Sequence, residues 1–196
     1  MKHLLAILLI LLASSQFSTA QDSNARRLAQ PIQYNNKIGF AGSMFSAYGI
    51  SYEYDASRDF TFELTGAVFG EGGNTGSSYD NSNSYLTVAI GAEVQRNFIN
   101  TLDTRFYGFV GIGYWLENNS YTYNNYYSNY KDYTGGLGIG WEMSFFKRFV
   151  LNVEGGYVYR DMNRESNDYN GSNYTATIRH TYYLGFGVGA GIYYTF

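Results

Sequence analysis

A strict two-residue alternation over residues 179–196 constrains this chain more than any other feature. Between Leu184 and Ile192 every even-numbered residue is apolar, whereas Gly185, Gly187, Gly189 and Gly191 occupy the odd-numbered positions. Successive side chains of a β-strand point to opposite faces, so the segment predicts a strand with one apolar face and one nearly bare face. A helix, with 3.6 residues per turn, would not separate the two sets in this way.

The same alternation recurs upstream. Apolar residues such as Ile139 and Trp141 face away from Gly138 and Gly140, and Leu151 and Val153 face away from Asn152 and Glu154. We predict eight strands in all: the three that include 137–145, 149–159 and 179–196, together with 37–44, 47–54, 59–69, 85–98 and 105–116.

The predicted connections alternate in length. Segments 55–58, 99–103 and 146–148 are short, whereas 70–84, 117–132 and 161–177 are long and polar. Short turns on one rim and long loops on the other are typical of an eight-stranded antiparallel up-and-down transmembrane β-barrel, an all-β fold. The connection at 42–46 is unusually short for the side of the long loops, so 37–54 also fits one strand with a bend.

A soluble barrel or sandwich would show the same alternation, with its apolar face turned inward. Two features favour apolar side chains that face lipid instead. The apolar row of the last strand begins at Tyr182 and ends at Tyr194 and Phe196, as expected for a band flanked by interfacial aromatic residues. The opposite row is rich in glycine, which weakens a solvent-exposed strand but suits a crowded, narrow interior.

The N-terminus has the pattern of an export signal. Lys2 and His3 precede an apolar run over 4–13, and small residues lead to Ser18 and Ala20. We predict a signal peptide over 1–20, a periplasmic segment over 21–36 and the barrel over 37–196. A membrane-anchoring helix is the alternative for the first segment, but its apolar run is too short to span a bilayer.

Composition excludes several classes of site. The chain has no cysteine, so it contains neither a disulfide framework nor a cysteine-based zinc or iron–sulfur site. A net charge of −3 provides no basic surface for nucleic acid. Glycine recurs every second residue within strands rather than in a strand–turn–helix loop, so no nucleotide-binding motif is present. We expect no cofactor and no bound metal.

Charged residues concentrate on the inward rows of the predicted barrel. Two interpretations fit them: a plug of ion pairs and hydrogen bonds, with Lys37 and Arg160 as further basic partners, or a narrow acid-lined path for ions or protons. The predicted interior network comprises Glu53, Glu63, Glu93, Arg105, Glu142, Glu154 and Arg179.

An enzyme that modifies lipids would ordinarily need a nucleophile, a base and an orienting acid. His180 is the one histidine beyond the predicted signal peptide, and it falls on the outward row. Ser166, Asp161 and Asp168 precede it in a predicted loop, but their spacing does not require them to meet it. We therefore predict no catalytic residues and no enzymatic activity.

The long loops combine tyrosine with asparagine, which is a mixture that binding loops favour because tyrosine offers rigid contact area and asparagine adaptable hydrogen bonds. Any polar loop near lipid headgroups can have this composition, so a specific ligand does not follow from it. The predicted loop surface comprises Tyr121, Tyr123, Tyr126, Tyr127, Tyr130, Tyr169 and Tyr174.

Residues 33–196 resemble the small outer-membrane β-barrel family that includes the transmembrane domain of outer membrane protein A and the whole of outer membrane protein X. The most specific element is the last strand, where Ile192, Tyr194 and Phe196 look like the C-terminal signal that the barrel-assembly machinery reads. The resemblance implies a monomer in the outer membrane of a Gram-negative bacterium, in contact with lipid and lipopolysaccharide. It also implies a plugged interior and surface loops that serve adhesion, immune evasion or envelope integrity.

Overall fold

The structure, a computed structural model, describes residues 36–75, 81–101, 103–121, 126–146, 148–169 and 174–196. The predicted signal peptide, 1–20, lies outside these residues, as does the predicted periplasmic segment except for Asn36. No helix in this described part of the chain is long and apolar enough to cross a membrane.

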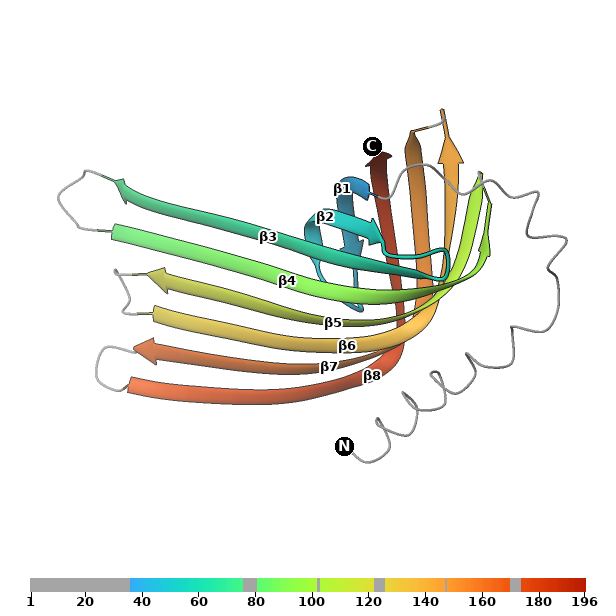
Figure 1. Cartoon of the computed structure of the whole chain (residues 1–196). Coiled ribbons are helices and arrows are strands. Elements are labelled where there is room, and N and C mark those ends of the chain that lie inside the picture. Colours follow the sequence, from blue (N-terminus) through green and yellow to red (C-terminus); the bar gives the residue numbers. More distant parts are fainter. Residues whose placement is uncertain (1–35, 76–80, 102, 122–125, 147, 170–173) are drawn as a thin grey trace, which may run out of the picture. The chain divides into compact units, whose positions relative to one another are not determined.

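The described residues form eight strands (Figure 1). They are β1 (Asn36–Ser43), β2 (Tyr48–Asp55), β3 (Phe60–Thr75), β4 (Asn81–Asn100), β5 (Thr104–Tyr121), β6 (Tyr126–Phe145), β7 (Phe149–Tyr169) and β8 (Tyr174–Thr195). Each strand pairs antiparallel with the next, and β8 pairs with β1 to close the ring. The predicted all-β up-and-down barrel is therefore confirmed, and the first hairpin is two strands rather than one bent strand.

The strands differ greatly in length, because β1 and β2 have 8 residues each whereas β8 has 22. β1 pairs with β8 only from Lys37↔Thr195 to Ser43↔Gly189. β2 pairs with β3 only over 50–55 and 61–66. Strands β3 to β8 run on past this hairpin as an open sheet (Figure 1). Within the described chain, the outer edges of β3 over 67–75 and of β8 over 174–187 have no neighbouring strand.

The predicted long loops are mostly strand, so that prediction was wrong. The described residues of segments 70–84, 117–132 and 161–177 continue the hairpins β3–β4, β5–β6 and β7–β8 in regular register. The prediction weighed asparagine and glycine as turn formers, but tyrosine and threonine favour strands, and cross-strand pairs stabilise the ladder. Glu117 and Tyr130, for example, lie directly opposite each other on β5 and β6. We call these extensions the hairpin arms.

The two faces of the strands point as predicted. Leu184 and Phe186 on β8 face outward and are 77% and 64% exposed. Gly187, Gly189 and Gly191 face the interior and are buried. The outward face of the ring is therefore apolar, and the interior holds the polar and charged side chains.

The connection between β1 and β2 folds into the barrel rather than over its rim. Phe45 is fully buried and packs with Tyr107, Phe109 and Val158, the buried apolar cluster of the described residues. Backbone hydrogen bonds hold this turn at both ends, from Ser43 N to Ala47 O at 2.9 Å and from Met44 N to Val188 O at 3.1 Å. We call residues 44–47 the plug turn.

Glycine on the facing strands makes room for the plug turn. A Cβ at Gly113 would overlap the Ser46 carbonyl, and a Cβ at Gly136 would lie 2.6 Å from the Phe45 ring. These positions require glycine because backbone and ring approach the strand directly. The glycine-rich interior row read from the sequence thus reflects a part of the chain that enters the lumen.

Candidate functional site

A layer of ion pairs crosses the lumen near the short turns. Lys37 and Glu53 lie opposite each other on β1 and β2, and Arg105 and Glu142 on β5 and β6. The Lys37 Nζ lies 2.6 Å from Glu53 Oε2 and 2.9 Å from Glu142 Oε2. Arg105 Nη2 lies 3.0 Å from the same Glu53 oxygen and also contacts Glu142. Two cations and two carboxylates on four strands thus form one buried set, which we call the ion-pair layer.

Neutral groups add hydrogen bonds to the Arg105 guanidinium, whose Nε has no partner among the described residues. It donates to Thr61 Oγ1 at 2.6 Å and to Gln95 Oε1 at 2.7 Å, and it lies 4.5 Å from the centre of the Tyr107 ring. Asp55 contributes a longer ion pair at 3.8 Å. A buried ion pair is stable only when hydrogen bonds replace its lost water in this way.

A second acidic group lies in the lumen beside the ion-pair layer. Carboxylate oxygens of Glu63, Glu93 and Glu154 lie within 4.8 Å of one another. Ser43 Oγ donates to Glu154 at 3.1 Å and lies 3.3 Å from Glu93, and the Tyr107 hydroxyl donates to Glu154 at 2.8 Å. We call these three residues the glutamate triad.

Hydrogen bonds also fix the position of Glu63. Ser51 Oγ and Thr65 Oγ1 donate to its Oε1 at 2.7 and 2.9 Å, and the Gln95 amide donates to its Oε2 at 2.9 Å. The Tyr193 hydroxyl adds a bond of 3.0 Å. Glu63 is therefore held in one orientation by four side chains.

A cavity of about 260 Å³ lies where the plug turn meets the hairpin arms. Met44, Tyr48 and Trp115 line its apolar part, and Asp132 and Arg160 form an ion pair in its wall. Tyr130, on the arm beside this pair, places its hydroxyl 3.4 Å from Asp132. Burial and the Asp132 carboxylate raise the pKa of Tyr130 above its usual value.

The structure brings together most of the predicted interior network. Glu53, Glu63, Glu93, Arg105, Glu142 and Glu154 all line the lumen, and Lys37 joins them as the second cation. Arg179 was assigned to this network wrongly. It lies on the β8 arm opposite Arg164 and is exposed, because the ring closes well below that point and no lumen exists there.

The predicted tyrosine surface lies on the arms rather than on loops, which corrects its secondary structure. Tyr121, Tyr126, Tyr169 and Tyr174 occupy the strand ends, whereas Tyr123 lies outside the described residues. Tyr127 is exposed and Tyr130 is half-buried.

His180 lies on the outer surface, with Nε2 2.5 Å from Asp161 and Nδ1 3.0 Å from the Tyr182 hydroxyl. Its register partner on β7 is Asn163, which places Ser166 about 10 Å farther along that strand at 3.3 Å per residue. Ser166 therefore does not lie beside the histidine and the acid.

Sequence reasoning missed the plug turn. Its signal was present, because Met44 and Phe45 are apolar residues in a connection too short to form an exposed loop. In a polar rim these two apolar side chains would be exposed to water, whereas in the lumen they supply its apolar packing. Ser43 was missed for the same reason, although its hydroxyl joins two members of the glutamate triad.

No protein-family model matches the chain, and no curated protein matches it. Among solved structures, the chain is similar to a major outer membrane protein from Thermus thermophilus, at 13% sequence identity and a TM-score of 0.48. The similarity covers 84% of this chain and 100% of that one.

Proposed function

We propose that this chain is an outer-membrane β-barrel protein of a Gram-negative bacterium, with a plugged lumen and a structural, surface-interactive role through its hairpin arms. The apolar outer face of the ring carries the proposal. Ile139, Leu151, Val188 and Phe186, on neighbouring strands, all point outward and are exposed. Soluble monomers rarely leave an apolar surface of this extent in water, whereas a membrane barrel requires one.

Aromatic residues border this apolar surface on both sides. Phe149 and Tyr194 pack edge to face near the short turns, with ring centroids 5.6 Å apart. Tyr159 and Tyr182 stack at 6.3 Å near the base of the arms. Aromatic girdles of this kind mark the two interfaces of a lipid bilayer. They support short turns in the periplasm and arms outside the cell, in contact with lipopolysaccharide.

Where the ring is closed, over β1 and residues 189–195 of β8, each strand has a neighbour on both sides to hydrogen-bond its backbone, as a membrane barrel requires. Within that ring, the lumen contents favour a plug over a conduit. The ion-pair layer and the Phe45 cluster both lie across the interior, one made of paired charges and the other of packed rings. An ion would have to displace both, so we infer a barrel without steady conductance. We propose separately that the barrel is a monomer and has no enzymatic activity.

The arms supply the interaction surface in this proposal. They carry tyrosine and asparagine on strands that project beyond the closed ring, and Tyr127 presents its side chain to solvent. The outward residues Ile192, Tyr194 and Phe196 of the closing strand are proposed to be the segment that the barrel-assembly machinery reads.

Heat modifiability of the protein in membrane fractions tests the location. A folded barrel migrates differently on a gel before and after boiling, and it sediments with outer membranes. Recovery in the soluble periplasmic fraction without such a shift would refute the proposal. Planar-bilayer recording tests the plug: rare, small openings are expected, and frequent steady conductance would favour the acid-lined conduit instead.

A further inference from the structure

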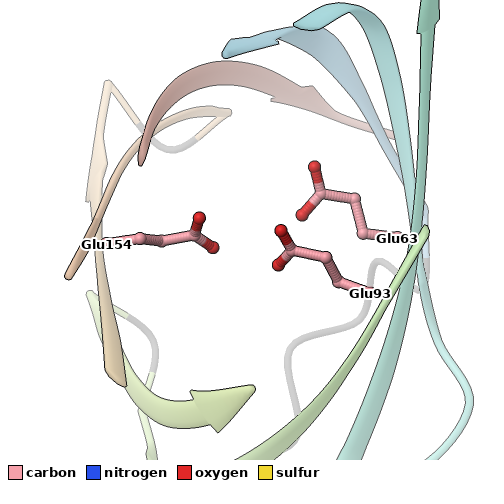
Figure 2. A group of neighbouring side chains, drawn as sticks. All are labelled: Glu63, Glu93 and Glu154. Carbon is pink, nitrogen blue, oxygen red and sulfur yellow. The ribbon is translucent and has the colours of Figure 1, made fainter. Parts of the chain in front are cut away.

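The glutamate triad brings carboxylates from opposite walls of the barrel to one place. Glu63 and Glu93 are direct register partners on β3 and β4, and Glu154 extends from β7 on the other side (Figure 2). Their nearest oxygens lie within 4.8 Å of one another. Like charges this close repel strongly unless a cation or protons lie between them.

The lumen cations Lys37, Arg105 and Arg160 form ion pairs with carboxylates other than those of the glutamate triad. Lys37 and Arg105 make their ion pairs with Glu53, Asp55 and Glu142. Arg160 pairs with Asp132 beside the cavity. Among the described residues, none of these three cations forms an ion pair with Glu63, Glu93 or Glu154. The triad therefore receives no counter-charge from these three lumen cations, although buried carboxylates need one.

Oxygen atoms without hydrogen-bond partners also lie at the triad. In the described part of the chain, Glu93 Oε2 and Ser46 Oγ are buried, and neither has a partner at normal hydrogen-bond distance. Ser46, only 3% exposed, belongs to the plug turn, and its hydroxyl makes no more than a long, weak hydrogen bond to the Glu93 carboxylate. A buried polar atom without a partner is unfavourable, and one bound ion would be a partner for both oxygens. The plug turn thus adds a neutral oxygen to an acidic cluster.

We propose that Glu63, Glu93 and Glu154 bind a calcium ion inside the barrel, with the Ser46 hydroxyl as a neutral ligand. All these donors are oxygen atoms, which hard cations prefer, and no nitrogen or sulfur ligand is among them. Oxygens on opposite sides of a Ca²⁺ ion lie about 4.6–5.2 Å apart, and oxygens on opposite sides of a Mg²⁺ ion lie about 4.0–4.2 Å apart. The three oxygens, all within 4.8 Å of one another, lie inside the span of one calcium coordination sphere.

The surroundings suit a site of this kind. Four side chains hold Glu63 by hydrogen bonds, and Tyr107 and Ser43 hold Glu154, so the carboxylates are oriented before a metal arrives. A bound calcium ion would link β3 and β4 to β7 across the lumen and join the plug turn to all three. The site goes beyond the proposed surface role and does not depend on it.

Metal content of the refolded chain tests the proposal directly. The chain is refolded with Ca²⁺ in detergent free of lipopolysaccharide, dialysed against metal-free buffer, and its bound calcium is measured. We expect one Ca²⁺ per chain, and Tb³⁺ in its place should show luminescence sensitised by Tyr107, whose hydroxyl contacts Glu154. Less than a stoichiometric amount, or equal retention of Mg²⁺ under the same protocol, would overturn the proposal.

Two variants separate the triad from other acidic residues. Glu93→Gln should weaken Ca²⁺ binding at least tenfold, whereas Glu71→Gln, at an exposed carboxylate on β3, should leave it unchanged. Heat modifiability reports whether each variant is folded, and Glu154→Gln replaces Glu93→Gln if the latter does not fold. Wild-type affinity in a folded triad variant would show that the ion binds elsewhere.

Discussion

Phe45→Ala tests whether the plug turn stabilises the barrel through packing. Phe45 is 0% exposed, and its ring meets Phe109 edge to face with centroids 4.8 Å apart. Removal of a buried phenylalanine ring costs about 3–5 kcal/mol, of which part is lost transfer energy and part the cavity left behind. The wall around the ring includes Gly136 and Gly187, which have no side chains to move into the space. We therefore expect a loss of about 4 kcal/mol in the free energy of unfolding.

Phe40→Ala is the matched control. Phe40 lies on β1 in the same hairpin but faces outward and is 68% exposed. Fluid lipid or detergent refills the space that its ring leaves, so the cavity contribution is absent and the loss should be roughly half that of Phe45→Ala. Equilibrium urea unfolding of both refolded variants, followed by tryptophan fluorescence, measures the difference. If Phe45→Ala loses no more than Phe40→Ala, the plug turn does not pack as described.

Three further substitutions test the ion-pair layer, the glycine row and the apolar outer face. Arg105→Leu leaves the buried carboxylates of Glu53 and Glu142 to share Lys37 alone and should cost about 3–5 kcal/mol, seen as a lower unfolding temperature on heated gels. An unchanged temperature would remove Arg105 from the layer. Gly113→Ala should destabilise the folded state by about 1–3 kcal/mol because the added Cβ meets backbone atoms. Gly135→Ala should be tolerated because the nearest atom to its added Cβ is 3.8 Å away. Equal urea midpoints for the two variants would contradict the crowding at Gly113. Val188→Arg should lower the free energy of unfolding in lipid vesicles by about 2–4 kcal/mol because the arginine faces hydrocarbon. A similar loss in Ile178→Arg, on the arm, would argue against a membrane band at Val188.

The faces of the strands could be predicted from the sequence because a two-residue period has only two phases. Once Leu184 and Gly185 are assigned to opposite faces, Ile192 and Gly191 follow, and the same reasoning placed Glu53 and Arg105 in the interior. The identity of the partners within the lumen was less accessible. Which carboxylate meets which cation depends on the register between strands that are far apart in sequence, as for Arg105 and Glu53.

The arms and the plug turn could not be predicted for a different reason. Beyond the closed ring the described residues of the arms bury no apolar side chain, and the buried ones, Ser128 and Asp132, are polar. The arms therefore have no apolar alternation to mark them, and Asn118 and Asn129 look like loop residues although they pair directly. The misplacement of Arg179 follows from this, because an inward residue has a lumen to enter only where the ring is closed. The local signal of the plug turn, the apolar Met44 and Phe45 in a short connection, indicates burial but does not show which strands the turn packs against, because those contacts are tertiary.

The plug turn has a consequence for the order in which the barrel forms. Thr134 on β6 donates to the Met44 carbonyl at 2.7 Å, and Met44 N donates to Val188 on β8. An early part of the chain thus reaches its final place only when the last strand has arrived. Contacts so distant in sequence slow folding because a long loop must close before they can form. We expect the first hairpin to reach its native position late in biogenesis, so that pairing of β1 with β8 and insertion of the plug turn into the lumen occur in the same step.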